Sequence, residues 1–227
     1  MLFFSKLQIY TTIMKKLFLV SLLIFILFLN KTFAEKIIAF EFTQNEFASL
    51  EKKKVKGETI WTLGSNEKGN YIKAEANAAG SGLGKKIKID LKKTPFLNIT
   101  WKVEKDLVGI VESSKKGHDY AARVFVIKKT GMTALSNKAI NYVFSSNNNI
   151  GENWRSPYTK QSIDYILSTT KDNFNKWVTV KVNVKDHFKK FHNLDVNELN
   201  GIALMSDTDN SGLSAVSYYQ NIYFSTK

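Results

Sequence analysis

Alternation of apolar and polar side chains with a period of two residues is the feature that most restricts how this chain can fold. It is clearest at 97–104 (LNITWKVE) and 178–185 (VTVKVNVK), where apolar residues fall on one face and polar residues on the other. This pattern is typical of half-buried strands in an antiparallel sheet. Both segments are therefore predicted strands.

Further strands are predicted at 36–42, 71–76, 86–91, 120–128, 139–145, 163–168, 201–206 and 214–225. Clusters rich in Gly, Asn, Ser or Lys separate them, including 80–82, 115–117 and 147–149. About ten strands without a long amphipathic helix between them predict an all-β fold, an antiparallel β-sandwich or jelly roll. Only 45–53 and 184–191 are candidates for short helices, the second being the better one.

The N-terminal segment has the pattern of a secretory signal. The lysine pair at 15–16 precedes an apolar run at 17–29, which only Ser21 interrupts, and the small-residue site Thr32-Phe33-Ala34 follows. The run is shorter than the roughly 20 residues of a membrane-spanning helix. We therefore expect cleavage after Ala34 and a periplasmic or secreted product that meets the membrane only through this signal, with an uncleaved anchor as the alternative.

Residues 1–13 read as a mis-assigned start or an unusually long leader, because Met14 directly precedes the lysine pair. The remaining chain, 35–227, has the length of one ordinary domain and contains no linker or repeat. The chain has no cysteine. Its stability outside the cytoplasm must therefore come from core burial, helped at most by a metal ion.

The formal net charge of +13 comes almost entirely from lysine, since only Arg123 and Arg155 are arginine. Proteins that bind phosphates and bases favour arginine, whose planar guanidinium makes two parallel hydrogen bonds. The lysines of this chain are, in addition, dispersed along the sequence. The composition therefore argues against a nucleic-acid partner. It indicates a lysine-rich solvated surface, with attraction to an anionic envelope polymer as the alternative.

A polar segment at 206–212 (SDTDNSG) follows the apolar strand at 201–205. Its oxygen ligands at alternating positions, Asp207, Asp209 and Ser211, suit a structural calcium ion. It is not an EF-hand, because the twelfth position holds Tyr218 in place of Glu. The alternative is a polar β-turn whose side chains bond their own backbone.

Arg123 lies in a segment, 118–127, that is predicted to be a strand buried on both faces. A buried guanidinium is costly unless it is paired. Arg123 should therefore meet a carboxylate of Asp119, Asp207 or Asp209, or else contact a ligand in a wet groove.

Aromatic residues beside amides and arginine mark a candidate sugar-binding surface. Trp154 and Tyr158 follow an Asn-rich loop, and Tyr142 lies on the strand before it. Aromatic faces stack on the C–H faces of sugar rings while polar groups bond the hydroxyls. Together with Arg123 and Asn210, these are the predicted ligand contacts, although such aromatics are also common as core anchors.

Catalytic residues are not identifiable from the sequence. A thiol nucleophile is excluded, and the chain has no Gly-x-Ser-x-Gly elbow, paired-histidine zinc spacing or P-loop. The histidines at 118, 187 and 192 are isolated. Two carboxylates flanking a groove would suffice for glycoside hydrolysis, but spacing alone does not bring two together.

The order of motifs resembles the bacterial exported family catalogued as domain of unknown function 3047. The segments that carry the resemblance are 73–74 (KA), 81–83 (SGL), 87–91, 95–97 (PFL), 101–103 (WKV), 119–126 (DYAARVFV), 140–143 (INYV), 154–158 (WRSPY), 202–212 and 218–222 (YYQNI). The resemblance implies a periplasmic or secreted β-sandwich similar to carbohydrate-binding, galactose-binding-like jelly rolls. It implies no activity.

Three functions follow as hypotheses. The first is a non-catalytic module that binds a glycan or another envelope polymer. The second is a sandwich-type carbohydrate hydrolase that uses Asp119, Asp207 or Asp209 as acid and base. The third is a structural or assembly protein of the cell envelope. The sequence does not indicate the oligomeric state.

Overall fold

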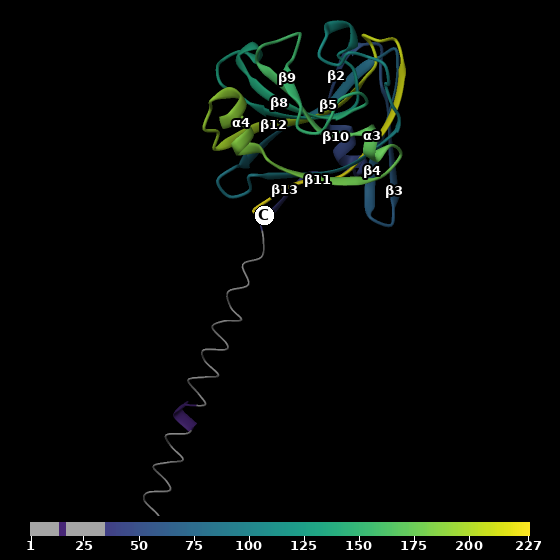
Figure 1. Cartoon of the computed structure of the whole chain (residues 1–227). Coiled ribbons are helices and arrows are strands. Elements are labelled where there is room, and N and C mark those ends of the chain that lie inside the picture. The colour runs from purple at the N-terminus through teal and green to yellow at the C-terminus, as the bar shows by residue number, and fades with distance from the viewer. Residues whose placement is uncertain (1–13, 17–34) are drawn as a thin grey trace, which may run out of the picture. The chain divides into compact units, whose positions relative to one another are not determined.

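Two β-sheets pack against each other in the computed structural model, which describes residues 14–16 and 35–227 (Figure 1). We call them sheet A and sheet B. Sheet A has the strand order β11-β6-β13-β4-β3, and β1 pairs with the far end of β13. Its strands are β1 (Lys36–Phe40), β3 (Ile60–Asn66), β4 (Gly69–Asn77), β6 (Phe96–Lys105), β11 (Val178–Asn183) and β13 (Ser214–Ser225).

Sheet B has the order β2-β5-β12-β7-β8-β10-β9. Its strands are β2 (Glu51–Lys56), β5 (Gly80–Asp90), β7 (Tyr120–Lys128), β8 (Lys138–Ser145), β9 (Asn153–Arg155), β10 (Ser162–Thr169) and β12 (Glu198–Asp207). The expectation of purely antiparallel pairing is wrong at one place, because β8 and β10 run parallel. The chain between these two strands makes the crossover that parallel neighbours require, and β9 lies within it.

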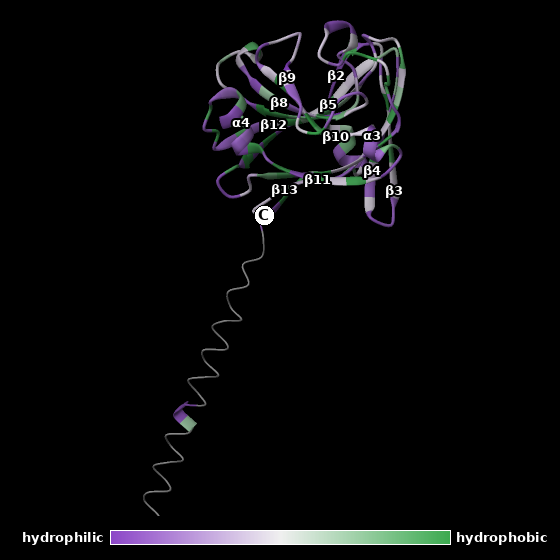
Figure 2. Cartoon of the chain, in the orientation of Figure 1, coloured by the Kyte–Doolittle hydropathy of each residue, from purple (hydrophilic) through white to green (hydrophobic). Residues whose placement is uncertain are grey.

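The helices are short. They are α2 (Gln44–Ser49), α3 (Thr170–Asn173), α4 (Val184–His192) and the 3₁₀ turns η1 (Lys115–Gly117) and η2 (Ala134–Ser136). The Asn183 side chain caps the start of α4, and Asn193, in the left-handed conformation, ends it. Figure 2 shows α4 as mostly hydrophilic. No helix within 14–16 or 35–227 is long and apolar enough to cross a bilayer.

The core lies between the two sheets and follows the alternation of the sequence. Ile72, Ala74, Trp101 and Tyr219 of sheet A and Val124 of sheet B are fully buried in one cluster. The indole Nε1 of Trp101 donates to Ser168 Oγ at 2.9 Å, so its polar atom is satisfied inside. The predicted β-sandwich is confirmed, with residues 35–227 forming one compact unit.

Residues 35–227 contain thirteen strands, more than the ten or so that were predicted. Strands β2, β3 and β9 are the missed ones. The helix expected at 45–53 ends at Ser49, and β2 follows as a fully exposed edge strand with four lysines and one glutamate. Charged side chains are common on edge strands because they prevent pairing with other chains.

The glycine cluster at 80–82 is strand, contrary to the expected turn. A Cβ on Gly80 would lie 2.6 Å from Asp209 Oδ1, and a Cβ on Gly82 would lie 2.9 Å from the Leu204 carbonyl oxygen. The glycines are therefore needed for the close approach of β12 and its following loop.

The predicted signal at 17–34 and the leader at 1–13 lie outside the described residues. Export therefore remains a prediction from the sequence.

Candidate functional site

Three carboxylates meet at the end of β12. Asp207 closes this strand, Asp209 lies two residues further along, and Asp119 precedes β7; one oxygen of each lies within 4.8 Å of the others. The structure thus brings together side chains that are almost ninety residues apart in sequence. These are the residues that can hold a hard cation, because carboxylate oxygens are the ligands that calcium prefers.

Arg123 neutralises one of these carboxylates. Its Nε donates to Asp207 Oδ1 at 3.0 Å, and its Nη2 contacts the other carboxylate oxygen. The guanidinium also lies 4.8 Å from the centre of the Tyr120 ring. Arg123 is 3% exposed and Asp207 is 1% exposed. Of the two roles predicted for Arg123, the structure shows the ion pair and leaves no accessible surface for a ligand.

The loop between β12 and β13 donates the hydrogen bonds that hold the Asp119 side chain. Its carboxylate accepts the backbone N–H of Asn210 at 3.2 Å and of Ser211 at 2.6 Å, and the Asn210 side-chain amide at 2.8 Å. The Tyr158 hydroxyl lies against the Asn210 carboxamide and donates to the Lys115 carbonyl at 3.0 Å. Ser211 Oγ donates to the Thr208 carbonyl at 3.5 Å and accepts the backbone N–H of Leu213 at 3.3 Å. The loop is therefore ordered by its own polar groups.

These contacts limit the chemistry of the carboxylate cluster. Asp119 is 0% exposed and, like Asp207, is covered by protein. A general acid or base must come within hydrogen-bond reach of the bond it cleaves. Neither group meets that condition for a glycosidic bond, so the geometry gives no support to the hydrolase hypothesis. Asp209, which is partly exposed, is the accessible member.

A buried histidine and carboxylate lie next to this cluster. His118 Nε2 is 2.7 Å from Asp164 Oδ2, and the Asn141 side-chain amide donates to Asp164 Oδ1 at 2.6 Å. The rings of Tyr120 and Tyr158 pack edge-on against the imidazole. All of Asp164 and nearly all of His118 are buried, so this network fastens the chain before β7 to sheet B.

Tyr142 is wrongly predicted as a ligand contact. Its side chain points into the core from β8 and is 0% exposed, and this burial raises the pKa of its hydroxyl. Alternation along a strand puts neighbouring residues on opposite faces, and the sequence does not say which face of β8 is inside.

Trp154 is half-buried on β9 and packs against Tyr120, Val143 and Ile166. Its Nε1 is buried and has no hydrogen-bond partner among the described residues. Tyr158 is exposed but lies at the end of the carboxylate network. Apart from Tyr142, the predicted contacts thus lie in one region of largely buried side chains, with Tyr158 as its exposed edge.

A second group of aromatic residues, which the sequence did not reveal, lies on the outward face of sheet A. Tyr71 of β4, Trp177 at the start of β11 and Tyr218 of β13 have ring centres 5.7 to 6.0 Å apart. All three are partly exposed, and their strand neighbours Ile72 and Tyr219 point into the core. We call Tyr71, Trp177 and Tyr218 the ring cluster.

Gly64 of β3 makes room for one of these rings. It pairs in register with Tyr71, and a Cβ there would lie 2.4 Å from Tyr71 Cζ. The Tyr71 ring therefore lies across the glycine. Trp177 reaches over β6 from the edge strand, so the cluster spans the sheet from β11 to β4.

Charged side chains surround the ring cluster in neutral pairs. Lys73 bonds Glu75 and Lys102 bonds Glu104, each at 2.8 Å. The Lys102 ammonium lies 4.3 Å from the centre of the Tyr218 ring. Burial, followed by the hydrogen bond to Glu104, raises the pKa of Tyr218 to about 12. Its hydroxyl donates to Glu104 Oε2 at 3.0 Å.

A weak signal for the ring cluster exists in the sequence. Tyr71, Lys73 and Glu75 alternate on one face of a predicted strand, and Trp177 stands directly before another. Only the sheet order places β11 and β4 on the two sides of the β6–β13 pair. The pairing of distant strands is not contained in local patterns, so the convergence of the three rings was missed.

Comparisons with known proteins agree with the fold. Residues 45–223 match the family described as "Protein of unknown function (DUF3047)". No curated protein is significantly similar in sequence.

Among solved structures, the chain is similar to the family 30 carbohydrate-binding module of a cellulosomal cellulase of Clostridium thermocellum. The identity is 8%, over 85% of this chain and 98% of the module, with a TM-score of 0.50. For the family 11 module of another cellulosomal cellulase of the same organism, the identity is 12%, the coverage 85% and 94%, and the TM-score 0.48. At 8% identity, the likeness to the family 30 module shows a shared jelly-roll fold alone.

Proposed function

Because the chain belongs to the DUF3047 family of proteins of unknown function, its activity has to be inferred from its own surface, and we propose that it is a non-catalytic glycan-binding protein. The ring cluster on the outward face of sheet A is the observation that carries this proposal.

The ring cluster has the chemistry that recognises sugars. Aromatic rings offer apolar faces to the C–H faces of a pyranose, and nearby polar groups bond its hydroxyls. Here the polar groups are the Lys73–Glu75 and Lys102–Glu104 pairs and the Tyr218 hydroxyl. A purely apolar partner would leave these groups without bonds to water, whereas a sugar satisfies both kinds of surface.

Charge and ring geometry narrow the ligand. Lys73 and Lys102, whose ammonium groups lie over the Tyr218 ring, are each paired with a glutamate, so neither leaves an unpaired charge on that ring to attract an anionic polymer. The ring planes are inclined to one another by 59 to 66°. Three rings at such angles cannot lie flat on a crystalline polysaccharide. They suit a single neutral glycan chain that turns along its length.

The fold supports the same proposal. The solved structure with a TM-score of 0.50 is a module named for carbohydrate binding, and the ring cluster of this chain lies on an outward sheet face of the fold that the two share. The hydrolase hypothesis has no such support because Asp119 and Asp207 are covered. No described feature specifically favours a structural role in the envelope.

The test is a binding screen with protein comprising residues 35–227, the compact unit. Cellulose fragments, xylan, mannan, chitin fragments and peptidoglycan are offered in parallel, and affinities are measured by calorimetry. We expect Trp177→Ala to weaken binding by at least about 30-fold, since a central aromatic anchor contributes about 2 kcal/mol or more.

Tyr158→Ala is the matched control, because Tyr158 is 56% exposed and belongs to the region at the end of β12. It should bind as the unaltered protein does. If Tyr158→Ala abolishes binding and Trp177→Ala does not, the ring cluster is not the site. If none of the polysaccharides binds, the proposed function is wrong.

Export is part of the same proposal and rests on the signal pattern at 15–34. Sequencing of the N-terminus of protein recovered outside the cytoplasm should begin at Glu35. Recovery of the uncut chain from the cytoplasm would contradict it.

A further inference from the structure

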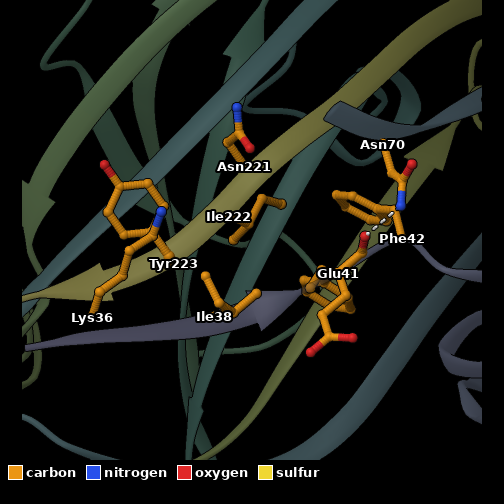
Figure 3. A pocket seen from close by; sticks show the side chains of 9 residues that line it. Lys36, Ile38, Glu41, Phe42, Asn70, Asn221, Ile222 and Tyr223 are labelled. Atoms are coloured by element: carbon orange, nitrogen blue, oxygen red, sulfur yellow. Dashed lines mark hydrogen bonds between the residues drawn. The ribbon is translucent and has the colours of Figure 1, made fainter. Parts of the chain in front are cut away.

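A pocket of about 260 Å³ opens on the outward face of sheet A, where β1 joins β13 (Figure 3). Its walls include Lys36, Ile38, Glu41, Asn70, Asn221 and Tyr223. This volume is slightly below the usual range for drug-sized ligands. The pocket therefore fits one ring-sized group.

Two residues in the left-handed backbone conformation line the pocket, Phe42 with φ 53° and Asn221 with φ 50°. Glu46 holds the first by accepting the backbone N–H of Glu41 at 2.7 Å and of Phe42 at 2.8 Å, while the Phe42 ring stacks on Phe40. Asn221 lies in a β-bulge of β13. Strained residues and bulges re-aim side chains and are frequent at ligand sites.

The pocket combines apolar surface with carboxamides. Ile38 is 44% exposed, and the Lys36 ammonium lies 3.8 Å from the centre of the Tyr223 ring. Figure 3 shows the Lys36 and Tyr223 side chains next to each other. The Asn70 Nδ2 donates to the Glu41 carbonyl at 3.4 Å, and this bond does not use the carboxamide oxygen. One lysine and one glutamate balance in charge. A ring with both C–H faces and hydroxyls, in other words a neutral sugar, matches these groups.

The pocket lies close to the ring cluster along β4 and β13. Asn70 directly precedes Tyr71, and Tyr71 pairs with Gln220, the residue before Asn221. Tyr218 and Tyr223 lie five residues apart on β13, which is about 15 Å at the rise of a strand. The order along the face is Trp177 with Tyr218, then Tyr71, then the pocket.

We propose that the ring cluster and the pocket bind different sugar residues of one neutral oligosaccharide. This inference rests on the glycan binding proposed above and adds a pocket that makes the site selective for chain length. A disaccharide reaches only the rings, whereas a chain of several residues also fills the pocket.

Chain-length dependence tests the proposal. Protein comprising residues 35–227 is titrated calorimetrically with oligosaccharides of two to six residues from cellulose, xylan, mannan and chitin. The pocket is altered by Asn221→Gly, which removes the carboxamide while glycine keeps the left-handed backbone, and separately by Ile38→Phe, which fills it.

Asn193→Gly is the matched control, because Asn193 has the same backbone conformation, φ 52°, and lies outside the pocket. We expect the hexasaccharide to bind the unaltered protein at least about tenfold more tightly than the disaccharide. Both pocket variants should lose most of this gain and keep the disaccharide affinity, and the control should keep both.

Pocket variants that bind the hexasaccharide as tightly as the unaltered protein would overturn the inference and leave the ring cluster as the whole site. If no oligosaccharide binds the unaltered protein, the proposed function fails with it. The two outcomes can be told apart. In the first, Trp177→Ala still weakens oligosaccharide binding, whereas in the second the unaltered protein binds no oligosaccharide.

Discussion

The buried pair of Arg123 and Asp207 shows how a single residue can be interpreted from the sequence alone. An arginine within an otherwise apolar strand needs a carboxylate, and Asp207 was among the three partners expected for it. The structure supplies this pair at 3.0 Å between Arg123 Nε and Asp207 Oδ1. The partner of Arg123 lies in a segment that is distant in sequence. The sequence therefore did not indicate which of the three carboxylates would pair with it.

Loss of Asp207 should be strongly destabilising. Asp207→Ala leaves the guanidinium buried and unpaired, and we expect the free energy of unfolding to fall by about 3 to 5 kcal/mol in urea titrations. The double variant Arg123→Met/Asp207→Leu should recover most of the loss.

The control for Asp207 is Glu58→Ala, which breaks the exposed pair with Lys54, whose side chains are 62% and 55% exposed. Its cost should stay below about 1 kcal/mol. The account of the buried pair is wrong if Asp207→Ala costs no more than this control.

His187 should make stability depend on pH. Burial, followed by the charge of Lys190, lowers its pKa from 6.5 to about 4, although Asp186 opposes the shift. The unfolded chain therefore takes up a proton first, and stability falls as the pH drops from about 6.5 to about 4. Burial lowers the pKa of His192 as well, so both histidines act in the same direction.

His187→Phe keeps an aromatic ring beside Tyr165 and Phe191 while it removes the titrating group. Comparison of unfolding free energies at pH 7 and pH 4.5 should show that the unaltered protein loses on the order of 1 kcal/mol more than the variant. Equal losses of unfolding free energy would mean that burial does not lower the pKa of His187 in the folded protein.

At the scale of elements, strands rich in apolar residues were predictable whether one face or both faces are buried, and exposed or very short strands were not. Strand β13, which alternates, and strand β7, which is buried on both faces, begin and end where they were predicted. The edge strand β2 is exposed at every position, and β9 has only three residues, so neither carries a periodic signal. Residues 80–82 were wrongly predicted as a turn. Their glycines lie in β5 and allow close packing against β12 and the loop that follows it.

The β12–β13 loop is the element for which we predict calcium. Asp119, Asp207 and Asp209 supply the oxygen ligands, and a ligand present at a hundred times its dissociation constant stabilises by about 2.7 kcal/mol. We therefore expect the melting temperature in millimolar calcium to exceed that in chelator by about 5 to 10 °C.

Asp209→Asn should remove the response to calcium, since Asp209 is the partly exposed member of the three. Melting curves that coincide with and without chelator would show that Arg123 and the loop hydrogen bonds alone satisfy these carboxylates.

For the whole molecule, the sandwich follows from alternation, turn residues and length, while the site follows from the order of strands in the sheets. Tyr71, Trp177 and Tyr218 belong to strands that are separated by up to 147 residues and become neighbours only through the order β11-β6-β13-β4. The aromatic ligand contacts predicted from the sequence were instead Trp154, Tyr158 and Tyr142, which are close together in the chain. Of these, Tyr142 lies in the core.

The most direct test of glycan binding by the ring cluster uses the four tryptophans of the chain as reporters. Indole N–H signals in ¹H–¹⁵N spectra of protein comprising residues 35–227, assigned with Trp177→Phe, are followed while a neutral oligosaccharide from the binding screen is added. We predict that the Trp177 signal shifts with saturation, while those of Trp61, Trp101 and Trp154 stay in place. A saturable shift of Trp154 with Trp177 unmoved would contradict the account and put the site at the end of β12.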